Sequence, residues 1–321
     1  MTVIEHRQVR TIARLPLPAV VCPRRIDWPY ASTVVVFHLI ALLSFVPLFF
    51  SWTGVILCAV SGFLLGLLGI NLCFHRLLTH RGLKCPKWFE HALAVLGVCC
   101  VQDTPMRWVA IHRRHHHHAD APPDPHSPLV NFFWGHVGWL LVKNREHDRL
   151  RLFDRYAKDL MRDPFYVKLE RNYNYYKIVF ASFLVVFVIG VATEVLMGGT
   201  LMDAVQFGLS LLVWGVFLRT VLVWHQTWAV NSISHLWGYR NYPTDEGSRN
   251  NVFVGILSNG EGWHNNHHAY PRAAKHGHRW WELDVTYLTI RLLAIVGLAS
   301  TIVLPNARTA GAQGSACWGS G

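Results

Sequence analysis

Four apolar runs constrain the fold of this chain more than any other feature. They lie at about residues 33–50, 53–73, 178–197 and 204–223. A helix of ~20 apolar residues, rising 1.5 Å per residue, crosses the ~30 Å hydrocarbon core of a bilayer. Only 15% of the 321 residues are charged, against about 25% in a typical soluble domain. The sequence therefore predicts an all-α integral membrane protein with four transmembrane helices.

The positions of Lys and Arg predict how these helices are oriented. The four runs come as two hairpins, and neither short turn, FSWTG or MGGTLMD, contains Lys or Arg. The segments outside the hairpins are basic, and loops that keep Lys and Arg stay in the cytoplasm. We therefore expect both termini to be cytoplasmic. The net charge of +11 follows this topology, and because no basic patch gathers it, nucleic acid is not an expected partner.

This topology divides the chain into three parts. We expect a cytosolic arm at 1–30, a single domain at 31–304 and a disordered Gly/Ala-rich tail at 305–321. Within the domain, 75–177 and 225–304 form a helical cap on the cytosolic side. The shorter apolar stretch at 89–101 is expected to be a re-entrant or interfacial helix, and the stretch at 285–304 an amphipathic interfacial helix. Arg219 is expected to snorkel to the membrane interface.

Histidines gather in four short segments, all on the side assigned to the cytoplasm. The segments are HRLLTH, HRRHHHH, NSISH and HNNHH. In the second and fourth, histidines spaced i, i+3 and i+4 share one face of a helix. On a straight α-helix, by contrast, His75 and His80 point about 140° apart, so the helix has to end or bend if the two are to meet.

The number of histidines exceeds what one metal ion binds. Zn²⁺ in proteins takes four ligands, whereas nine imidazoles suit two six-coordinate ions that keep positions open. The predicted ligands are His75, His80, His112, His115, His116, His235, His264, His267 and His268. Imidazole binds Zn, Cu, Fe and Ni alike, so the ligand set does not select the metal. His117 and His118 fall outside the helical register and are expected to be surface residues.

Carboxylates near these segments could orient the histidine rings. A ligand histidine usually donates its outer N–H to an acid, which also offsets the charge of the metal. The candidates are Asp103, Asp120, Asp124 and Glu261. Each could equally be an ordinary surface acid.

The same segments resemble those of a known family. HRLLTHRGLKCPKW, HRRHHHHADAPPDPHSP, NSISH and EGWHNNHHAYPRAAKHGHRWWELD are similar to the membrane-bound fatty acyl desaturases, in particular the bacterial delta-9 type related to stearoyl-CoA desaturase. The resemblance implies two non-haem Fe²⁺ ions held by the nine histidines, with Asn231 holding one iron through a water molecule. It also implies O₂ as co-substrate, a bacterial cytoplasmic membrane, and a narrow bent tunnel for a long-chain acyl substrate beneath the irons.

The resemblance also raises the question of partners and substrate head group. No HPGG motif of a fused cytochrome b5 domain is visible, so we expect an external donor, a ferredoxin or a cytochrome b5-like protein with its reductase. Arg113 and Arg114 are candidates to bind head-group phosphates, or they anchor the chain at the membrane. Trp108 and Trp263 either line the tunnel or belong to an interfacial belt. Coenzyme A, carrier protein and glycerolipid all remain open as acyl carriers.

Two other functions compete with desaturation. A lipid hydroxylase or ketolase on the same histidine-rich scaffold would insert oxygen after the same hydrogen abstraction. A metal transporter would place its ligands near the middle of the spans, whereas the histidines here collect at the cytoplasmic ends. The sequence therefore favours a desaturase that introduces a cis double bond.

Overall fold

Four long apolar helices run through the computed structural model, which describes residues 14–147 and 149–306. They cover Trp28–Phe45, Trp52–Thr79, Asn174–Leu196 and Leu201–Leu236. Large apolar side chains project outward from them, among them Phe45 and Leu196, which are 84% and 87% exposed. Such surfaces are unfavourable in water and match the interior of a bilayer. The chain is a membrane protein built mostly of helices.

The first two spans are longer or shifted relative to the sequence prediction. The first consists of α1 (Trp28–Ala41) and a 3₁₀ turn (Leu42–Phe45), so it begins before residue 33 and ends before residue 50. The second combines α2 (Trp52–Leu65) with a π-helical segment, η3 (Gly66–Thr79). It therefore continues beyond residue 73.

The last two spans show the same difference. α9 (Asn174–Leu196) packs against α10 (Leu201–Leu212), and a Cβ on Gly190 would lie only 2.8 Å from the Cα of Gly208. The fourth span continues through η6 (Val213–Leu218) and α11 (Arg219–Leu236), well past the predicted end at 223. A hydropathy profile places the end of a span at its first polar residues. In the structure the helix continues through these residues, which are buried among other helices.

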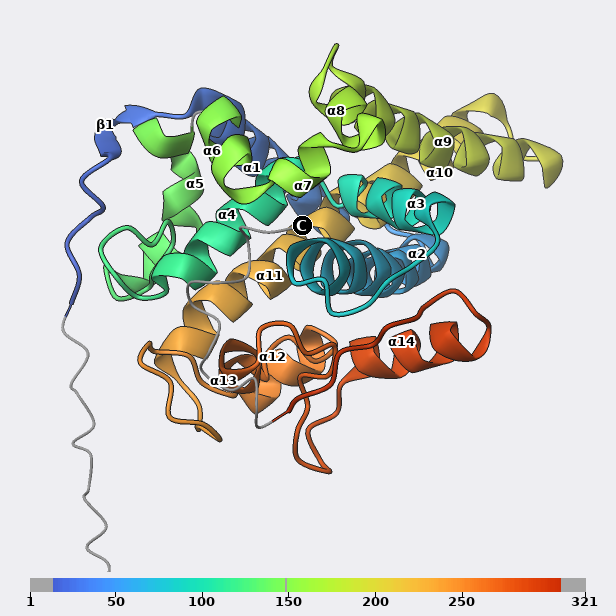
Figure 1. The fold of residues 1–321 in the computed structure, drawn as a ribbon. Coiled ribbons are helices and arrows are strands. Elements are labelled where there is room, and N and C mark those ends of the chain that lie inside the picture. Colours follow the sequence, from blue (N-terminus) through green and yellow to red (C-terminus); the bar gives the residue numbers. More distant parts are fainter. Residues whose placement is uncertain (1–13, 148, 307–321) are drawn as a thin grey trace, which may run out of the picture.

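The remaining segments lie around the four long helices (Figure 1). A two-stranded antiparallel ribbon pairs β1 (Val21–Ile26) with β2 (Val142–Asn144). The helices between the second and third spans are α3 (Lys87–Val98), α4 (Pro105–His118), η4 (Trp134–Gly138), α5 (Trp139–Leu141), η5 (Arg145–His147), α6 (Arg149–Tyr156), α7 (Lys158–Met161) and α8 (Pro164–Glu170). After the fourth span come α12 (Val252–Leu257), α13 (His264–Ala269) and α14 (Val285–Ile295). The expected tail, 305–321, lies outside the described residues except for its first two.

Helix α3 enters the bundle and ends among the spans. A Cβ on Gly69 of η3 would lie 2.5 Å from the backbone N of Gly97, so these two helices touch through glycine. Just beyond α3, Arg219 Nη1 donates to the Cys99 carbonyl at 2.8 Å. Trp224 Nε1 donates to the Cys100 carbonyl at 2.9 Å. Arg219 is therefore buried and satisfies carbonyls at a helix end, and the prediction that it snorkels is wrong.

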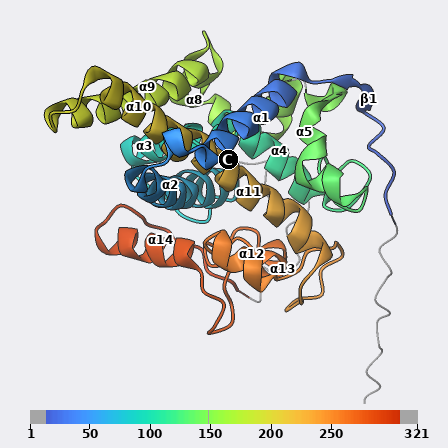
Figure 2. The same cartoon turned by 180° about the vertical axis from the view of Figure 1, so that it is seen from behind.

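Helix α11 crosses the middle of the molecule in both views, from α10 toward α12 and α13 (Figures 1 and 2). It contacts α1, α2, η4, α12 and α13. The main core cluster lies beside it, between η3, α3, α4 and α6. This arrangement brings the ends of η3, α4, α11 and α13 together.

Candidate metal centre

The four histidine segments of the sequence meet at one place in the structure. They come from the end of η3, from α4, from the end of α11 and from α13. All nine predicted ligands fall into two groups, and within each group one ring nitrogen per residue lies within 4.8 Å of the others. One group is His75, His80, His112, His116 and His267, and the other is His115, His235, His264 and His268.

The π-helical geometry of η3 brings His75 and His80 together. The His80 N–H donates to the His75 carbonyl at 3.1 Å, and the Thr79 hydroxyl donates to the Phe74 carbonyl at 2.7 Å. The first bond links backbone groups five residues apart, as in a π-helix, so residues at i and i+5 lie on the same side of the helix. The two imidazole centroids lie 4.8 Å apart, and the divergence expected on an α-helix does not occur.

Ring nitrogens face one another across both groups. The Nε2 atoms lie 3.1 Å apart in His112 and His116, and 3.0 Å apart in His264 and His268. These pairs follow from i, i+4 spacing on α4 and α13. Between segments, Nε2 of His267 lies 2.9 Å from Nε2 of His116.

Three of the four predicted carboxylates accept the outer N–H of a ligand histidine. The Nδ1–carboxylate distances are 2.6 Å for His75 and Glu261, 3.0 Å for His115 and Asp124, and 2.8 Å for His235 and Asp120. When Nδ1 carries the hydrogen and donates it, Nε2 has a free lone pair that is directed into the cluster. This is the tautomer that binds a metal through Nε2.

The donor set fits two metal ions. Burial, with neighbouring imidazoles as the next cause, lowers the pKa of His112, His116 and His264 well below the usual 6.5, so these rings are neutral. Neither nitrogen of His80 has a hydrogen-bond partner among the described residues. Buried lone pairs that face one another repel, and a cation between them removes this cost. Imidazole alone admits Fe, Zn, Cu or Ni.

Three residues near the centre were missed in the sequence. His126 stacks on His115 at 4.4 Å, and His276 lies 4.5 Å from the His267 ring with its Nδ1 3.2 Å from Glu261. A carboxylate oxygen of Glu246 lies 3.7 Å from Nδ1 of His268. Only His126, two residues after Asp124, carried a usable signal, since short polar segments next to ligands tend to fold back on them.

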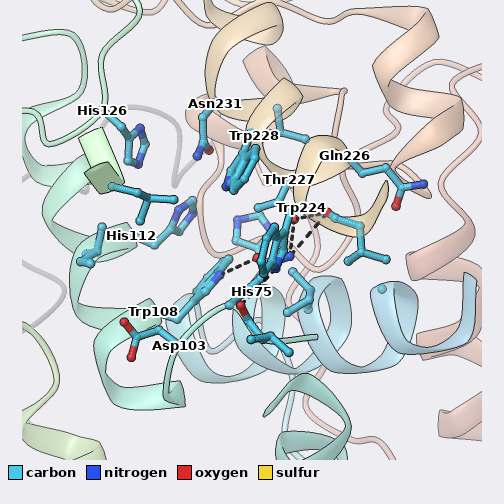
Figure 3. Close-up of a pocket in the computed structure, with 18 of the residues that line it drawn as sticks. His75, Asp103, Trp108, His112, His126, Trp224, Gln226, Thr227, Trp228 and Asn231 are labelled. Carbon is cyan, nitrogen blue, oxygen red and sulfur yellow. Dashed lines mark hydrogen bonds between the residues drawn. The ribbon is translucent and has the colours of Figure 1, made fainter. Parts of the chain in front are cut away.

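An apolar pocket reaches both groups of histidines, at His75 and His112 of the first and at His264 of the second. Figure 3 shows His75, His112 and Asn231 around it, together with three tryptophans, Trp108, Trp224 and Trp228. Trp108 stacks on His112, with ring centroids 5.0 Å apart. Predominantly apolar walls with few polar groups are typical of a site for a small apolar molecule.

A polar network braces one wall of this pocket. Gln102 Nε2 donates to the Thr227 hydroxyl at 2.9 Å, and Trp108 Nε1 donates to Gln102 Oε1 at 3.3 Å. The Thr227 hydroxyl in turn donates to the Val223 carbonyl at 3.1 Å. Each polar side chain is thereby held in one orientation by the next.

Asp103 is separate from the histidines. It lines the pocket, accepts a hydrogen bond from the Tyr30 hydroxyl and pairs with Arg107 at 2.9 Å and Arg149 at 3.8 Å. The Arg107 guanidinium also lies 4.8 Å from the Tyr30 ring centroid. The expectation that Asp103 orients a ligand histidine is therefore wrong, because its oxygens serve this charged cluster.

Arg113 and Arg114 are not available for phosphate. Arg113, 2% exposed, donates to the Leu78 and Thr79 carbonyls at 2.7 and 3.0 Å and pairs with Asp159 at 2.6 Å. Arg114, also 2% exposed, donates to the Pro123 carbonyl and pairs with Glu146. A buried guanidinium needs such partners, and the contacts of Arg113 attach α4 to the end of η3 and to α7.

The two candidate tunnel tryptophans differ in their surroundings. Trp108 lines the pocket. Trp263 does not: it is buried, and its Nε1 donates to the Leu283 carbonyl at 2.8 Å. A Cβ on Gly255 would lie 2.9 Å from its ring, so Trp263 fills the contact between α12 and the segment before α13.

Comparison with known proteins identifies relatives of this architecture. A family model described as fatty acid desaturase matches residues 50–291. An sn-2 palmitoyl-lipid 9-desaturase of Nostoc sp. (strain 36) is 44% identical over 269 residues, covering 84% of this chain and 87% of the relative. An sn-1 stearoyl-lipid 9-desaturase of Anabaena variabilis is 39% identical, with 88% and 96% coverage. An icosanoyl-CoA 5-desaturase of Limnanthes douglasii is 40% identical, with 87% and 73% coverage.

Proposed function

This chain belongs to the fatty acid desaturase family, and from that premise we propose that it introduces a cis delta-9 double bond into a long-chain acyl group. The family makes it an oxidoreductase of lipid metabolism that acts on a lipid substrate. The observation that carries the proposal is the meeting of nine histidines, in two groups, beside an apolar pocket. The names of the lipid 9-desaturases support the position of the double bond, and the acyl carrier is a membrane lipid or coenzyme A.

We propose iron as the metal and O₂ as the oxidant. Bound iron and O₂ together supply an oxidant strong enough to remove hydrogen from an unactivated methylene, which no side chain can do. Overall, two hydrogen atoms leave the acyl chain, and these, with two electrons from the donor and two protons from solvent, reduce O₂ to two waters. The nine histidines hold the metals, and Asn231, which lines the pocket, would hold one iron through a water molecule.

The pocket residues position the chain and exclude water. Trp108 stands against His112, so an acyl chain in the pocket passes the ligand histidines with an aromatic wall on one side. The hydrogen bond between Gln102 and Thr227 fixes the width of the pocket beside Trp108. A misplacement of ~1 Å can cost about 100-fold in rate, so the carbons beside His75 and His112 are those that react.

The orientation in the membrane follows from the distribution of basic residues. We propose that the spans form two hairpins, with both termini and the metal centre on the cytoplasmic side of a bacterial membrane. Electrons then come from a cytoplasmic ferredoxin or cytochrome b5-like protein and its reductase. The cap segments at 75–177 and 225–304 form the surface that this donor would reach.

The test is expression in a host that makes no monounsaturated fatty acids. We expect cis delta-9 acyl chains in the host lipids, and mapping the double bond in each lipid class identifies the acyl carrier. Products heavier by one oxygen atom, instead of lighter by two hydrogens, would support a hydroxylase or ketolase. Unchanged lipids in a host supplied with a donor would contradict the proposal.

A further inference from the structure

Three histidines outside the metal centre form a chain of contacts between α1, α11 and η4. Nε2 of His38 lies 3.1 Å from Nε2 of His225, and Nδ1 of His225 lies 2.9 Å from Nε2 of His136. Nδ1 of His136 lies 2.9 Å from the hydroxyl of Ser232. The proposed desaturation uses none of these residues, and none of them lines the pocket.

The direction of each hydrogen bond can be worked out from the Ser232 end. The Ser232 hydroxyl donates to the Trp228 carbonyl at 2.8 Å, so its oxygen accepts from His136 Nδ1–H. In a neutral imidazole only one nitrogen carries hydrogen. Nε2 of His136 therefore accepts from His225 Nδ1–H, and Nε2 of His225 is left as a lone pair.

The same reasoning applies from the other end. Nδ1 of His38 lies 2.7 Å from the Val34 carbonyl, which can only accept, so Nδ1 carries the hydrogen and Nε2 is a lone pair. Two lone pairs thus face each other at 3.1 Å with no hydrogen between them. A cation between the rings removes this repulsion.

The distance between His38 Nε2 and His225 Nε2 can be compared with Nε2–Nε2 distances in the candidate metal centre. There, Nε2 atoms of ligand pairs lie 3.0 Å apart in His235 and His264 and 3.2 Å apart in His75 and His267. The separation of His38 and His225 falls between these values. His136 and Ser232 also orient His225 as the carboxylates orient the ligands of the centre.

We propose that His38 and His225 form a second metal site, which takes a divalent transition metal such as Zn²⁺ with water as its other ligands. Imidazole is a preferred ligand of zinc. His225 is exposed and His38 half-buried, so water can complete the coordination. The site joins α1 to α11, whose other residues, among them Val34 and Thr227, line the pocket.

The test is zinc uptake by the iron-loaded protein in detergent. Wild type, His38→Gln and His225→Gln are titrated with Zn²⁺, passed through gel filtration and analysed for zinc and iron per chain. His118→Gln is the control, because His118 also lies in a pair of neighbouring histidine rings. We expect one zinc ion per chain fewer in the first two variants than in wild type and in the control. A His136→Phe variant should bind zinc ~10–100-fold more weakly.

Iron content and desaturation in zinc-free buffer should be the same in wild type, His38→Gln, His225→Gln and His118→Gln, which shows that the variants are folded. Because His225 is exposed, its variant suffices if His38→Gln does not fold. Equal zinc uptake by wild type and His225→Gln would overturn the proposal, and the two lone pairs would then share a proton instead.

Discussion

Nδ1 of His75 lies 2.6 Å from Oε2 of Glu261, and the other oxygen of the same carboxylate accepts from Arg76 at 2.8 and 3.0 Å. Glu261 thereby fixes the hydrogen of His75 on Nδ1 and directs its Nε2 to the cluster. Arg76 also pairs with Asp284 at 2.9 Å. The orientation of one ligand thus depends on a buried ion-pair network that ties η3 to the segments around α13.

The first prediction concerns this carboxylate. Glu261→Gln removes the charge that holds the His75 hydrogen, and we expect iron affinity to fall ~10–100-fold. Iron retained per chain after dialysis against a chelator measures the effect. Asp154→Asn, an exposed carboxylate next to Lys158, is the charge-matched control. Equal iron retention in the two variants would contradict the role of Glu261.

The second prediction compares two histidines of the chain. His268 belongs to the second ligand group, whereas His118 lies outside both groups. We expect His268→Ala to lose iron and to reduce desaturation more than ~100-fold, beyond the usual cost of losing an outer partner. His118→Ala should keep both. Iron and product are measured on the same preparations, and similar losses in both variants would show that the ligand assignment is wrong.

Much of the site could be predicted from the sequence, because i, i+3 and i+4 spacing on α4 and α13 fixes which histidines share a face. Helical spacing did not predict that His75 and His80 meet, because they do so only through the π-helical form of η3. η3 packs against α3 and α4, and local sequence does not report such long-range contacts. The helices also extend beyond the predicted spans for a related reason: hydropathy cannot distinguish a polar residue in water from one buried in protein.

Two of the candidate substrate residues share one property. Arg113 and Trp263 lie next to ligand segments, but long-range partners, Asp159 and Leu283, take their polar atoms. His276 and Glu246 were missed because they lie in non-helical segments after His268 and His235, where spacing in sequence does not predict which side chains meet. Proximity in sequence predicted which histidines share a metal-binding group better than it predicted which neighbouring residues contact those histidines.

The third prediction concerns the pocket wall. Thr227→Val keeps the shape of the side chain and removes the hydroxyl that accepts the hydrogen bond from Gln102 Nε2. Freed from this bond, the wall lets the acyl chain shift, and we expect a lower rate, by up to about 100-fold, with some products desaturated at a neighbouring position. Mapping the double bond by mass spectrometry measures the shift. Wild-type rate and position in this variant would show that the bond does not position the substrate.

The fourth prediction concerns stability. Burial alone would raise the pKa of Asp159, but hydrogen bonds and charges of Arg113 and Arg81 lower it from 3.8 to about 2. Because the pKa is lower in the folded state, the ionised carboxylate stabilises the fold above pH ~4, by about 2 kcal/mol, and this is lost as the pH falls from ~4 toward ~2. Asp159→Asn should therefore be destabilised at pH ~7 by about 2–4 kcal/mol, since it leaves Arg113 buried without its carboxylate.

Thermal unfolding of the purified protein, followed at several pH values, measures this difference. The gap between wild type and Asp159→Asn should narrow at low pH, where the wild-type carboxyl is also neutral. Asp154→Asn should unfold like wild type throughout. A gap that stays constant with pH would contradict the charged pairing of Asp159 with Arg113.

The fifth prediction concerns electrons. The purified, iron-loaded chain should form no product with O₂ and substrate alone, because the reaction consumes two external electrons. Adding a ferredoxin or cytochrome b5-like protein with its reductase should start turnover. Product formed without any reductant would mean that the overall balance proposed above is incorrect.

The most direct measurement is the number of iron ions per chain in a preparation that desaturates. The two groups of histidines, four in one and five in the other, predict two iron ions per chain, with activity rising as the second is loaded. A fully active preparation that holds one iron ion or none would contradict the account.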